Sequence, residues 1–211
     1  GFADPLQRHG WFIGRVAAYL KAKGRTAVAW NDVLKGDAPD PDVVICNWMD
    51  RAKQCVDRAN SGALIIEEDF FHYYMDYPYG MTPLKKTYTF DPLRKGLSAA
   101  GQKQVLGVET PIWTEFVRDF DTLCGLCFPR MLAVAERGWS DAHVKNYADF
   151  CTRAKQVLPL LEDLGIHAAP AAKWNPRGPF RLCGIVQHHR RSARVARENR
   201  ALEKEKASSV E

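Results

Sequence analysis

The sequence predicts an α/β fold of about four parallel strands with intervening helices, followed by a basic tail. Short, continuous apolar runs alternate with helix-length segments along the first part of the chain, which is typical of a parallel sheet covered on both faces. Large aromatic residues recur where these runs end. Four strand–helix units are half of an eight-unit (β/α)8 barrel, so we expect half of such a barrel.

The first predicted element is a helix, because the apolar residues from Phe12 to Leu20 recur at helical spacing and Gly24 follows as a C-cap. Four apolar runs are too short for helices and are predicted to be buried strands: residues 26–30, 42–48, 63–66 and 105–108. A short helix is expected near residues 50–60. The last strand is expected to run toward Trp113.

The segment after the third strand departs from this alternation. Residues 68–104 form a long connection rich in Tyr, Pro, Asp and Gly, and connections of this length in a compact domain are usually functional or disordered. Their aromatic content argues against disorder. Residues 121–138 and 140–164 are predicted helices; Pro129 either kinks the first or marks its start, and Ser140 is the candidate N-cap of the second.

The charge distribution separates a body from a tail. The net charge of +5 arises in the tail, because residues 171–211 hold 10 Lys or Arg against 4 Asp or Glu, whereas residues 1–170 hold 20 against 21. The nearly neutral body indicates no polyanionic partner. We therefore predict residues 1–167 to be the half-barrel and residues 168–211 to be a basic tail, either a solvated helix or disordered, with a nucleic-acid-binding arm as the less favoured alternative.

The cysteines do not form a metal-binding pattern. Cys124 and Cys127 are a lone Cys-x-x-Cys pair inside an apolar helical pattern, without a second pair or suitably spaced histidines. A redox role would need a thioredoxin-like context that the sequence lacks. We interpret the cysteines as packed core thiols, with disulfides as the alternative in a secreted form. No metal and no organic cofactor are expected.

The ends of all four predicted strands carry aromatic residues, two of them with carboxylates nearby: Trp30, Trp48, Tyr73-Tyr74-Met75-Asp76 and Trp113-Thr114-Glu115. In a parallel barrel these strand ends form one rim, and the chemistry of such barrels is found there. A single tryptophan at a strand end is commonly just part of the core. A set of aromatic faces with nearby carboxylates suits a sugar, because rings stack on C–H faces and carboxylates accept hydrogen bonds from hydroxyl groups.

Five ordered segments carry a resemblance to a known family. Trp30-Asn31-Asp32-Val33-Leu34 is similar to the Trp-Asp-Glu-Ile-Leu motif of family 20 glycoside hydrolases, the β-N-acetylhexosaminidases, and Tyr74-Met75-Asp76 resembles their Tyr-Leu-Asp. Three further segments resemble later parts of that family: Tyr88-Thr89-Phe90-Asp91-Pro92, Trp113-Thr114-Glu115 and Pro129-Arg130-Met131-Leu132-Ala133-Val134-Ala135-Glu136-Arg137-Gly138-Trp139-Ser140. The resemblance covers roughly residues 6–167 and implies the C-terminal half of a TIM-type catalytic barrel.

The resemblance implies substrate-assisted retaining hydrolysis, in which the acetamido oxygen of the substrate attacks the anomeric carbon and water opens the resulting oxazolinium ion. It also implies that three tryptophans wall the acetamide pocket: Trp30, Trp48 and Trp113. The Tyr74 hydroxyl would bind the acetamide oxygen. Asp76 and Glu115 would accept hydrogen bonds from the distal hydroxyls of the terminal sugar. The structural alternative is that Asp76 caps a loop and Glu115 pairs with Arg118.

The proton donor of that family is missing from this sequence. The family places it in a His-x-Gly-Gly-Asp-Glu type motif at the end of the fourth strand, whereas Glu67-Glu68-Asp69 lacks the glycines and follows a different strand. The family's arginine for sugar hydroxyls is missing too, and Asp32 replaces a usual glutamate. Without the acid, nothing protonates the leaving oxygen. We therefore expect no hexosaminidase activity from this chain alone.

Three functions are consistent with the sequence. The chain is part of an exo-acting β-N-acetylhexosaminidase for terminal N-acetylglucosamine or N-acetylgalactosamine, or a non-catalytic sugar-binding or assembly module, or an inactive truncated product. Half a barrel leaves unpaired sheet edges and an exposed inner face. We therefore expect the N-terminal half of the barrel as a partner, either upstream or in another chain. The start at Gly1 without a methionine is consistent with a fragment or a processed product.

No membrane partner is expected, because no apolar run approaches the roughly 20 residues needed to cross a bilayer. No signal peptide pattern opens the sequence. The compartment stays open among periplasmic, secreted, lysosomal and cytoplasmic locations.

Overall fold

The computed structural model describes residues 4–36, 39–50, 53–141 and 144–208, with side chains described as far as residue 202. The chain forms two compact units that alternate along the sequence. Unit 1 comprises Gly1–Tyr73, Phe90–Thr110 and Arg137–His143. Unit 2 comprises Tyr74–Thr89, Pro111–Glu136 and Val144–Glu211.

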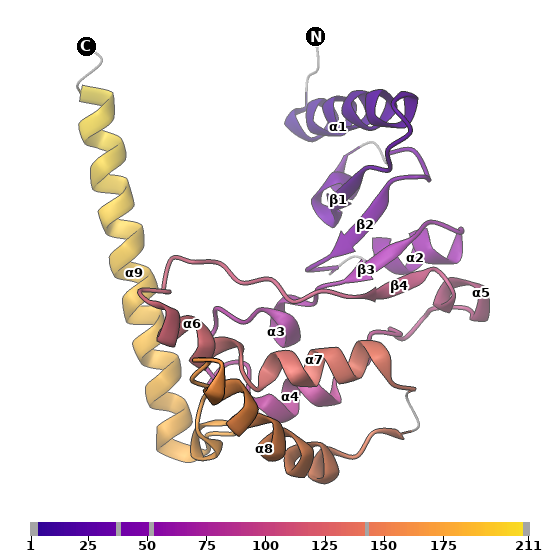
Figure 1. The fold of residues 1–211 in the computed structure, drawn as a ribbon. Coiled ribbons are helices and arrows are strands. Elements are labelled where there is room, and N and C mark those ends of the chain that lie inside the picture. Colours follow the sequence, from indigo (N-terminus) through magenta and orange to yellow (C-terminus); the bar gives the residue numbers. More distant parts are fainter. Residues whose placement is uncertain (1–3, 37–38, 51–52, 142–143, 209–211) are drawn as a thin grey trace. The chain divides into compact units, whose positions relative to one another are not determined.

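Unit 1 is built on a parallel sheet of four strands: β1 (Val28–Trp30), β2 (Val44–Asn47), β3 (Ile65–Glu67) and β4 (Val105–Val108). The strands lie side by side in sequence order (Figure 1). Val28 pairs with Val44, and Ile65 pairs with both Ile45 and Val105. The four predicted parallel strands are therefore confirmed, although β4 ends at Val108 and does not run on toward Trp113. All four carboxyl ends lie at the same edge of the sheet.

Helices cover one side of this sheet: α1 (Pro5–Ala22), η1 (Asn31–Lys35) and α2 (Gln54–Asn60), with the short α3 (Phe70–Tyr73) and α5 (Ala99–Gln102) further along the chain. Helix α1 begins where the Asp4 side chain accepts a hydrogen bond from the backbone N–H of Leu6. It ends as predicted near Gly24, whose φ of 68° suits a glycine after a helix end. The helices and the sheet of unit 1 share one core, which consists of Ala17, Val33, Leu34, Val43, Ile45, Cys55, Ala59 and Ile65.

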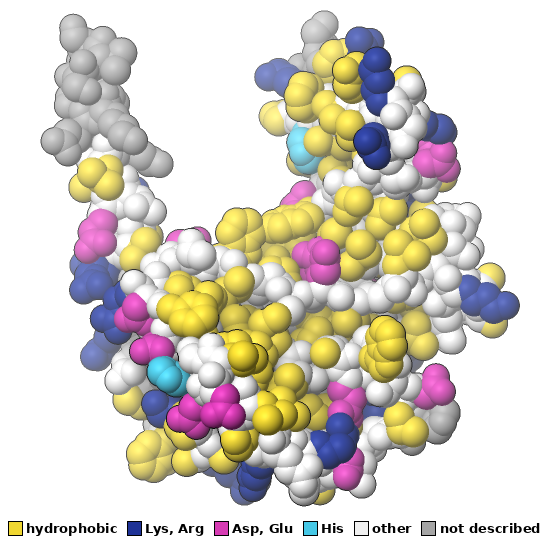
Figure 2. Space-filling view, viewed as in Figure 1, with side chains coloured by type: hydrophobic (Ala, Val, Ile, Leu, Met, Phe, Trp, Pro, Cys, Tyr) yellow, Lys and Arg dark blue, Asp and Glu magenta, His cyan; other side chains and the backbone are white. Residues whose placement is uncertain are grey.

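Unit 1 also carries much uncovered apolar surface. The apolar stripe that predicted α1 faces outward: Phe12 and Tyr19 are more than half exposed, while the buried residues of the helix are Gly10 and Ala17. Val28 and Leu106, on the two edge strands, are also mostly exposed. Figure 2 shows apolar side chains gathered over α1 and over the sheet. Large exposed apolar patches commonly mark a surface that another protein part covers.

Unit 2 is helical, with α4 (Leu84–Thr89), α6 (Phe120–Cys127), α7 (Arg130–Trp139, to Glu136 in this unit), α8 (Tyr147–Asp163), η3 (Ala171–Lys173) and α9 (Gly178–Ser208). Its core consists of Tyr79, Leu84, Tyr88, Ala133, Phe150, Ala154, Ala169 and Trp174. The predicted helix over 121–138 is two helices, and Pro129 precedes the start of the second. The long connection 68–104 is ordered and contains α3, α4 and α5.

One predicted helix start needs correction, and the structure decides between the two alternatives for the basic tail. Ser140 is not the N-cap of α8, because that helix begins at Tyr147 and the Asn146 side chain accepts a hydrogen bond from the backbone N–H of Asp149 at 3.1 Å. The basic tail forms helix α9, and the six half-buried residues between positions 184 and 195 recur at helical spacing: Gly184, Ile185, His188, Arg191, Ser192 and Val195. This packed face is mostly small or polar, so hydrophobic periodicity does not reveal it. None of the described helices is long and apolar enough to cross a membrane.

Candidate functional site

Unit 1 brings two of the predicted site tryptophans together. Trp30 is the last residue of β1 and Trp48 directly follows β2, so both lie at the carboxyl edge of the sheet. Their ring centroids are 6.3 Å apart with the planes tilted by 43°. Phe70 lies edge-on to Trp48 at 5.9 Å. Trp30 keeps 38% of its surface exposed, so the pair offers an aromatic face to a ligand.

Two neighbouring side chains of η1 hold Trp48 in place. The buried Asn31 accepts a hydrogen bond from the backbone N–H of Trp48 at 3.1 Å and donates one to the carbonyl oxygen of Met49 at 3.0 Å. Asp32 accepts a hydrogen bond from the indole Nε1 of Trp48 at 2.6 Å and also pairs with Lys35. Partial burial favours the neutral Asp32, but the hydrogen bonds from Lys35 and Trp48 outweigh it and lower the pKa of this carboxyl. Asp32, noted in the sequence only as a departure from a motif, thus orients the tryptophan.

Unit 2 brings the remaining predicted residues together. The segments that carry Tyr74 and Asp76 on one side and Trp113 and Glu115 on the other are joined by a backbone hydrogen bond from Met75 N–H to the carbonyl oxygen of Pro111, at 2.9 Å. The Asp76 carboxylate accepts a hydrogen bond from the backbone of Trp113 and lies close enough to Glu115 to feel its charge. Tyr74 is buried, whereas Trp113 and Glu115 are exposed.

Asp76 is the most constrained of these carboxylates. It is only 6% exposed, and no described group forms a hydrogen bond with its Oδ1 atom. Burial raises the pKa of Asp76 although backbone N–H groups act in the opposite direction. A buried acceptor without a donor is costly, and a ligand hydroxyl could supply that donor. The backbone hydrogen bond from Trp113 is the contact that the loop-capping alternative predicts, and it leaves the Oδ1 atom open as a second acceptor.

The segment that carries Asp76 is fixed by a buried arginine on α7. Arg130 is fully buried, and its five N–H donors reach four backbone carbonyl oxygens: those of Met75, Tyr77, Thr82 and Leu126, at 2.6–3.2 Å. Its guanidinium carbon also lies 4.4 Å from the centroid of the Tyr79 ring. The Arg130 guanidinium thereby links the residues on either side of Asp76, Met75 and Tyr77, to helices α6 and α7. The sequence contains this arginine within its longest motif but gives no sign of the partners.

A second charged network anchors the segment just before Tyr74, and sequence reasoning missed it. Arg94 donates to Glu67 at 2.8 Å and to Asp69 at 2.7 Å, and Asp69 pairs with His72 at 2.5 Å. Phe90 stacks against His72 at 4.3 Å. Burial raises the pKa of Glu67 to about 7 despite the attraction of Arg94. The network holds α3 against the end of β3, and Tyr74 directly follows α3.

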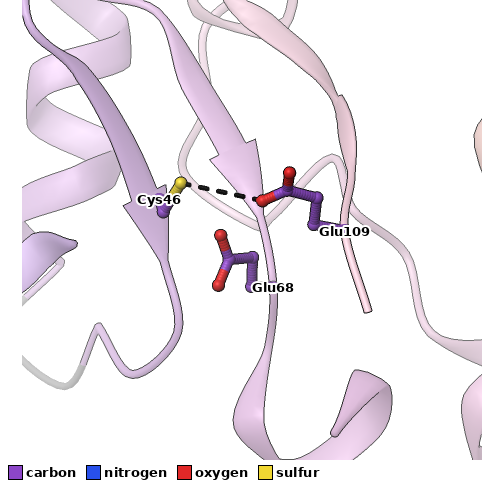
Figure 3. A group of neighbouring side chains, drawn as sticks. All are labelled: Cys46, Glu68 and Glu109. Atoms are coloured by element: carbon purple, nitrogen blue, oxygen red, sulfur yellow. Dashed lines mark hydrogen bonds between the residues drawn. The ribbon is translucent and has the colours of Figure 1, made fainter. Parts of the chain in front are cut away.

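A third group lies at the carboxyl ends of β2, β3 and β4. Cys46, Glu68 and Glu109 point toward one another, as Figure 3 shows, with Cys46 Sγ 3.9 Å from Glu109 Oε2. A thiolate and two carboxylates are a plausible ligand set for Zn²⁺. Burial raises the pKa of the Cys46 thiol, and the neighbouring Glu68 and Glu109 raise it further, so this thiol is protonated in the metal-free chain. Burial and the neighbouring Glu109 carboxyl raise the pKa of Glu68 and favour its protonated form.

Replacing Glu68 by glutamine is expected to flatten the pH dependence of stability. Burial, followed by the hydrogen bond with Glu109, raises the pKa of Glu68 to about 7, from 4.5 in the unfolded chain. A raised native pKa gives stability that is complete below pH 4.5 and is lost as the pH rises through 7, by roughly 3 kcal/mol in all. Urea unfolding between pH 5 and pH 8 measures this change. The side-chain amide of glutamine can still donate a hydrogen bond to Glu109 but does not titrate between pH 5 and pH 8.

The matched control is Glu162→Gln, which changes an exposed glutamate of α8. It should reproduce the wild-type pH profile. If Glu68→Gln and Glu162→Gln give parallel profiles between pH 5 and pH 8, the raised pKa of Glu68 in the folded chain is disproved.

Comparison with known proteins independently supports the family resemblance of the sequence. A family model described as "Glycosyl hydrolase family 20, catalytic domain" matches residues 2–142. The chain is 26% identical over 182 residues to a beta-hexosaminidase of Porphyromonas gingivalis, covering 79% of this chain and 23% of the relative. It is 25% identical over 182 residues to a beta-N-acetylhexosaminidase of Cellulomonas fimi, covering 79% of this chain and 36% of the relative.

A solved structure is also similar in fold to this chain. The structure of the GH20 beta-N-acetylhexosaminidase from Streptomyces coelicolor A3(2) superposes with a TM-score of 0.71 at 27% identity, covering 83% of this chain and 38% of that one. The family's solved structures are (β/α)8 barrels, so the predicted fold class, half of such a barrel, is confirmed. The chain spans less than two fifths of the length of each of these three relatives. The individual roles of the site residues stay predictions.

Proposed function

The chain belongs to glycosyl hydrolase family 20, and from that membership we propose that it is the C-terminal half of the catalytic barrel of an exo-acting β-N-acetylhexosaminidase. The proposed substrate is a glycan that ends in N-acetylglucosamine or N-acetylgalactosamine. The observation that supports this most directly is Asp76, a buried carboxylate held by the Trp113 backbone with one oxygen that no described group binds. Such an acceptor suits a sugar hydroxyl.

The proposed reaction uses the acetamide of the substrate as the nucleophile. Its oxygen attacks the anomeric carbon, the bond to the leaving oxygen breaks, and water then opens the oxazolinium ion with retention. In this proposal three tryptophans hold the acetamide under the ring: Trp30, Trp48 and Trp113. The Tyr74 hydroxyl donates a hydrogen bond to the acetamide oxygen and orients it. Holding a nucleophile in a near-attack geometry removes a large part of the barrier.

Asp76 and Glu115 are proposed to accept hydrogen bonds from the distal hydroxyls of the same sugar. Because both carboxylates lie on unit 2 close to the Trp113 backbone, one terminal sugar would contact all three residues. Binding of those distal hydroxyls requires that they carry no further sugar, which is the basis of exo action. Asp32 supports the acetamide wall indirectly, by orienting Trp48.

The acid that protonates the leaving oxygen must come from outside the 211 residues of this chain. The sequence contains no Gly-Gly-Asp-Glu segment, and the remaining half of the barrel is the proposed source. The exposed apolar residues of α1 and of the edge strands form a surface that this other half of the barrel would cover. They include Trp11, Phe12, Val28 and Leu106. Burying apolar area of this kind stabilises an assembled barrel by about 25 cal/mol per Å².

The 211-residue chain alone is expected to release no 4-nitrophenol from 4-nitrophenyl N-acetyl-β-glucosaminide, because it lacks the acid. Adding the N-terminal half of the barrel, joined upstream or as a separate chain, is expected to restore hydrolysis. Robust release by the chain alone would overturn the assignment of the acid to the other half. Sugar binding without hydrolysis in the assembled barrel would favour the alternative, a non-catalytic sugar-binding module.

A further inference from the structure

Helix α9 lies beyond the residues 2–142 that the family model matches, and it packs directly on the segment after Asp76. Arg181 Nε donates a hydrogen bond to the carbonyl oxygen of Gly80 at 3.0 Å. A Cβ atom at Gly80 would lie 2.9 Å from the backbone oxygen of Arg181, so only glycine allows this approach. Gly184, one turn further along α9, lies opposite the same glycine. The helix is therefore seated closely on unit 2.

The next turns of α9 interleave with two aromatic residues that directly follow the proposed sugar-binding carboxylates. Tyr77 follows Asp76 and Phe116 follows Glu115 in the sequence. The His188 ring lies 5.0 Å from the Tyr77 ring and 5.1 Å from the Phe116 ring. The guanidinium carbon of Arg191 lies 5.4 Å from the Phe116 centroid. These contacts place polar groups of the tail beside both carboxylate-bearing segments.

A pocket of about 190 Å³ lies between these elements within unit 2. Its lining includes Asp76, Pro78, Phe116, Gln187, His188 and Arg191. The wall from the Asp76 segment contributes a buried carboxylate whose Oδ1 has no donor among the described residues. The wall from α9 contributes N–H donors and an imidazole. An apolar ring, a buried acceptor and facing donors are the groups that recognise a hydroxylated sugar.

We propose that α9 forms one wall of the sugar pocket at Asp76, with His188 and Arg191 as specificity-determining residues for the non-reducing end of the terminal N-acetylhexosamine. The inference rests on the proposed function, because it takes Asp76 as a sugar ligand. Asp76 accepts a hydrogen bond from a ring hydroxyl, Arg191 donates to a neighbouring hydroxyl oxygen, and His188 limits the space between Tyr77 and Phe116. Burial, with His189 and Arg191 nearby, lowers the pKa of His188 and so supports a neutral ring near pH 7.

The first test is binding by the complete catalytic domain. N-acetylglucosamine is titrated while the histidine ring resonances are followed by NMR. The His188 resonances are expected to shift with saturation, because its ring lines the pocket. His167, an exposed histidine paired with Asp121 at 2.8 Å, is the control and should not move. Saturable sugar binding that leaves His188 unmoved would contradict the inference.

The second test compares two epimeric substrates, the 4-nitrophenyl β-glycosides of N-acetylglucosamine and N-acetylgalactosamine, which differ only at the 4-hydroxyl. His188→Ala and Arg191→Ala are each expected to change the ratio of kcat/KM between the two by about five-fold or more. The larger effect should be on KM. Arg190→Ala removes an exposed arginine from the same helix and should leave the ratio unchanged. An unchanged ratio in both pocket variants would show that α9 has only a structural role.

The two tests separate failure of this inference from failure of the proposed function. If the wild-type domain hydrolyses both glycosides but neither His188 nor the substrate ratio responds, the inference fails and the proposed function stands. If the domain neither binds N-acetylglucosamine nor hydrolyses either glycoside, the proposed function fails and the inference falls with it.

Discussion

Replacing Trp113 by alanine in the complete catalytic domain is expected to lower kcat by about 100-fold. Trp113 is 43% exposed, and its indole is proposed to form one wall of the acetamide pocket, while the backbone of the same residue holds Asp76. Alanine keeps the backbone hydrogen bond but removes the wall, so the acetamide oxygen loses its attacking position. A misplacement of about 1 Å can cost on the order of 100-fold in rate.

Steady-state kinetics with 4-nitrophenyl N-acetyl-β-glucosaminide measures this effect. The main loss should be in kcat, because the lost contact positions the nucleophile for attack and contributes less to binding of the ground state. Trp139→Ala is the matched control, since Trp139 is 93% exposed and has no proposed contact with the sugar. Unchanged kinetics in Trp113→Ala would disprove the role assigned to this tryptophan.

Replacing Arg130 by methionine is expected to lower the free energy of unfolding by about 3 kcal/mol or more. Methionine fills a similar space but donates no hydrogen bond, so the four carbonyl oxygens that Arg130 binds lose this donor, and two of these bonds, to Met75 and Thr82, are buried. Each unsatisfied buried acceptor costs about 1–3 kcal/mol. The desolvation cost of the buried cation is removed at the same time, which limits the total. Urea unfolding of the protein measures the difference.

Arg153→Met is the contrasting variant. Arg153 is half exposed and pairs with Glu136 at 2.6 Å and with Asp149 at 2.7 Å. Arg153 is open to water and its pair with Asp149 is exposed on both sides; ion pairs at the surface contribute about 0–1 kcal/mol, so the loss should be smaller than for Arg130. Arg130→Lys should fall between wild type and Arg130→Met, because an ammonium has three donors and no planar fork. Equal stability of Arg130→Met and Arg153→Met would show that the buried network contributes little.

The sequence predicted the parallel sheet well because each strand is a local feature. The runs around Ala29, Ile45, Ile65 and Leu106 are short and apolar, and they recur between helix-length segments. The sequence-based prediction was wrong about a helix start, because a single capping residue decides where a helix begins. Ser140 fits the general preference for an N-cap, yet Asn146 makes the capping hydrogen bond, and this choice depends on where the chain packs.

The site residues, like the strands, could be predicted from local features of the sequence. Trp30, Trp48, Asp76 and Trp113 were predicted from their position after strands and from motif resemblance. Their supporting partners were not predicted. Arg94 joins Glu67 and Asp69 from 25 or more positions away, and no local pattern indicates such a pairing.

The sequence by itself determined the strands, the family and the aromatic and acidic residues at the strand ends, because these features depend on near neighbours in the chain. Only the tertiary structure decided that Arg130 holds the segment around Asp76 and that the basic tail folds as α9 against Tyr77 and Phe116. Those contacts join residues roughly 50 to 110 positions apart. Their energies come from burial and hydrogen bonding that exist only once the chain has folded.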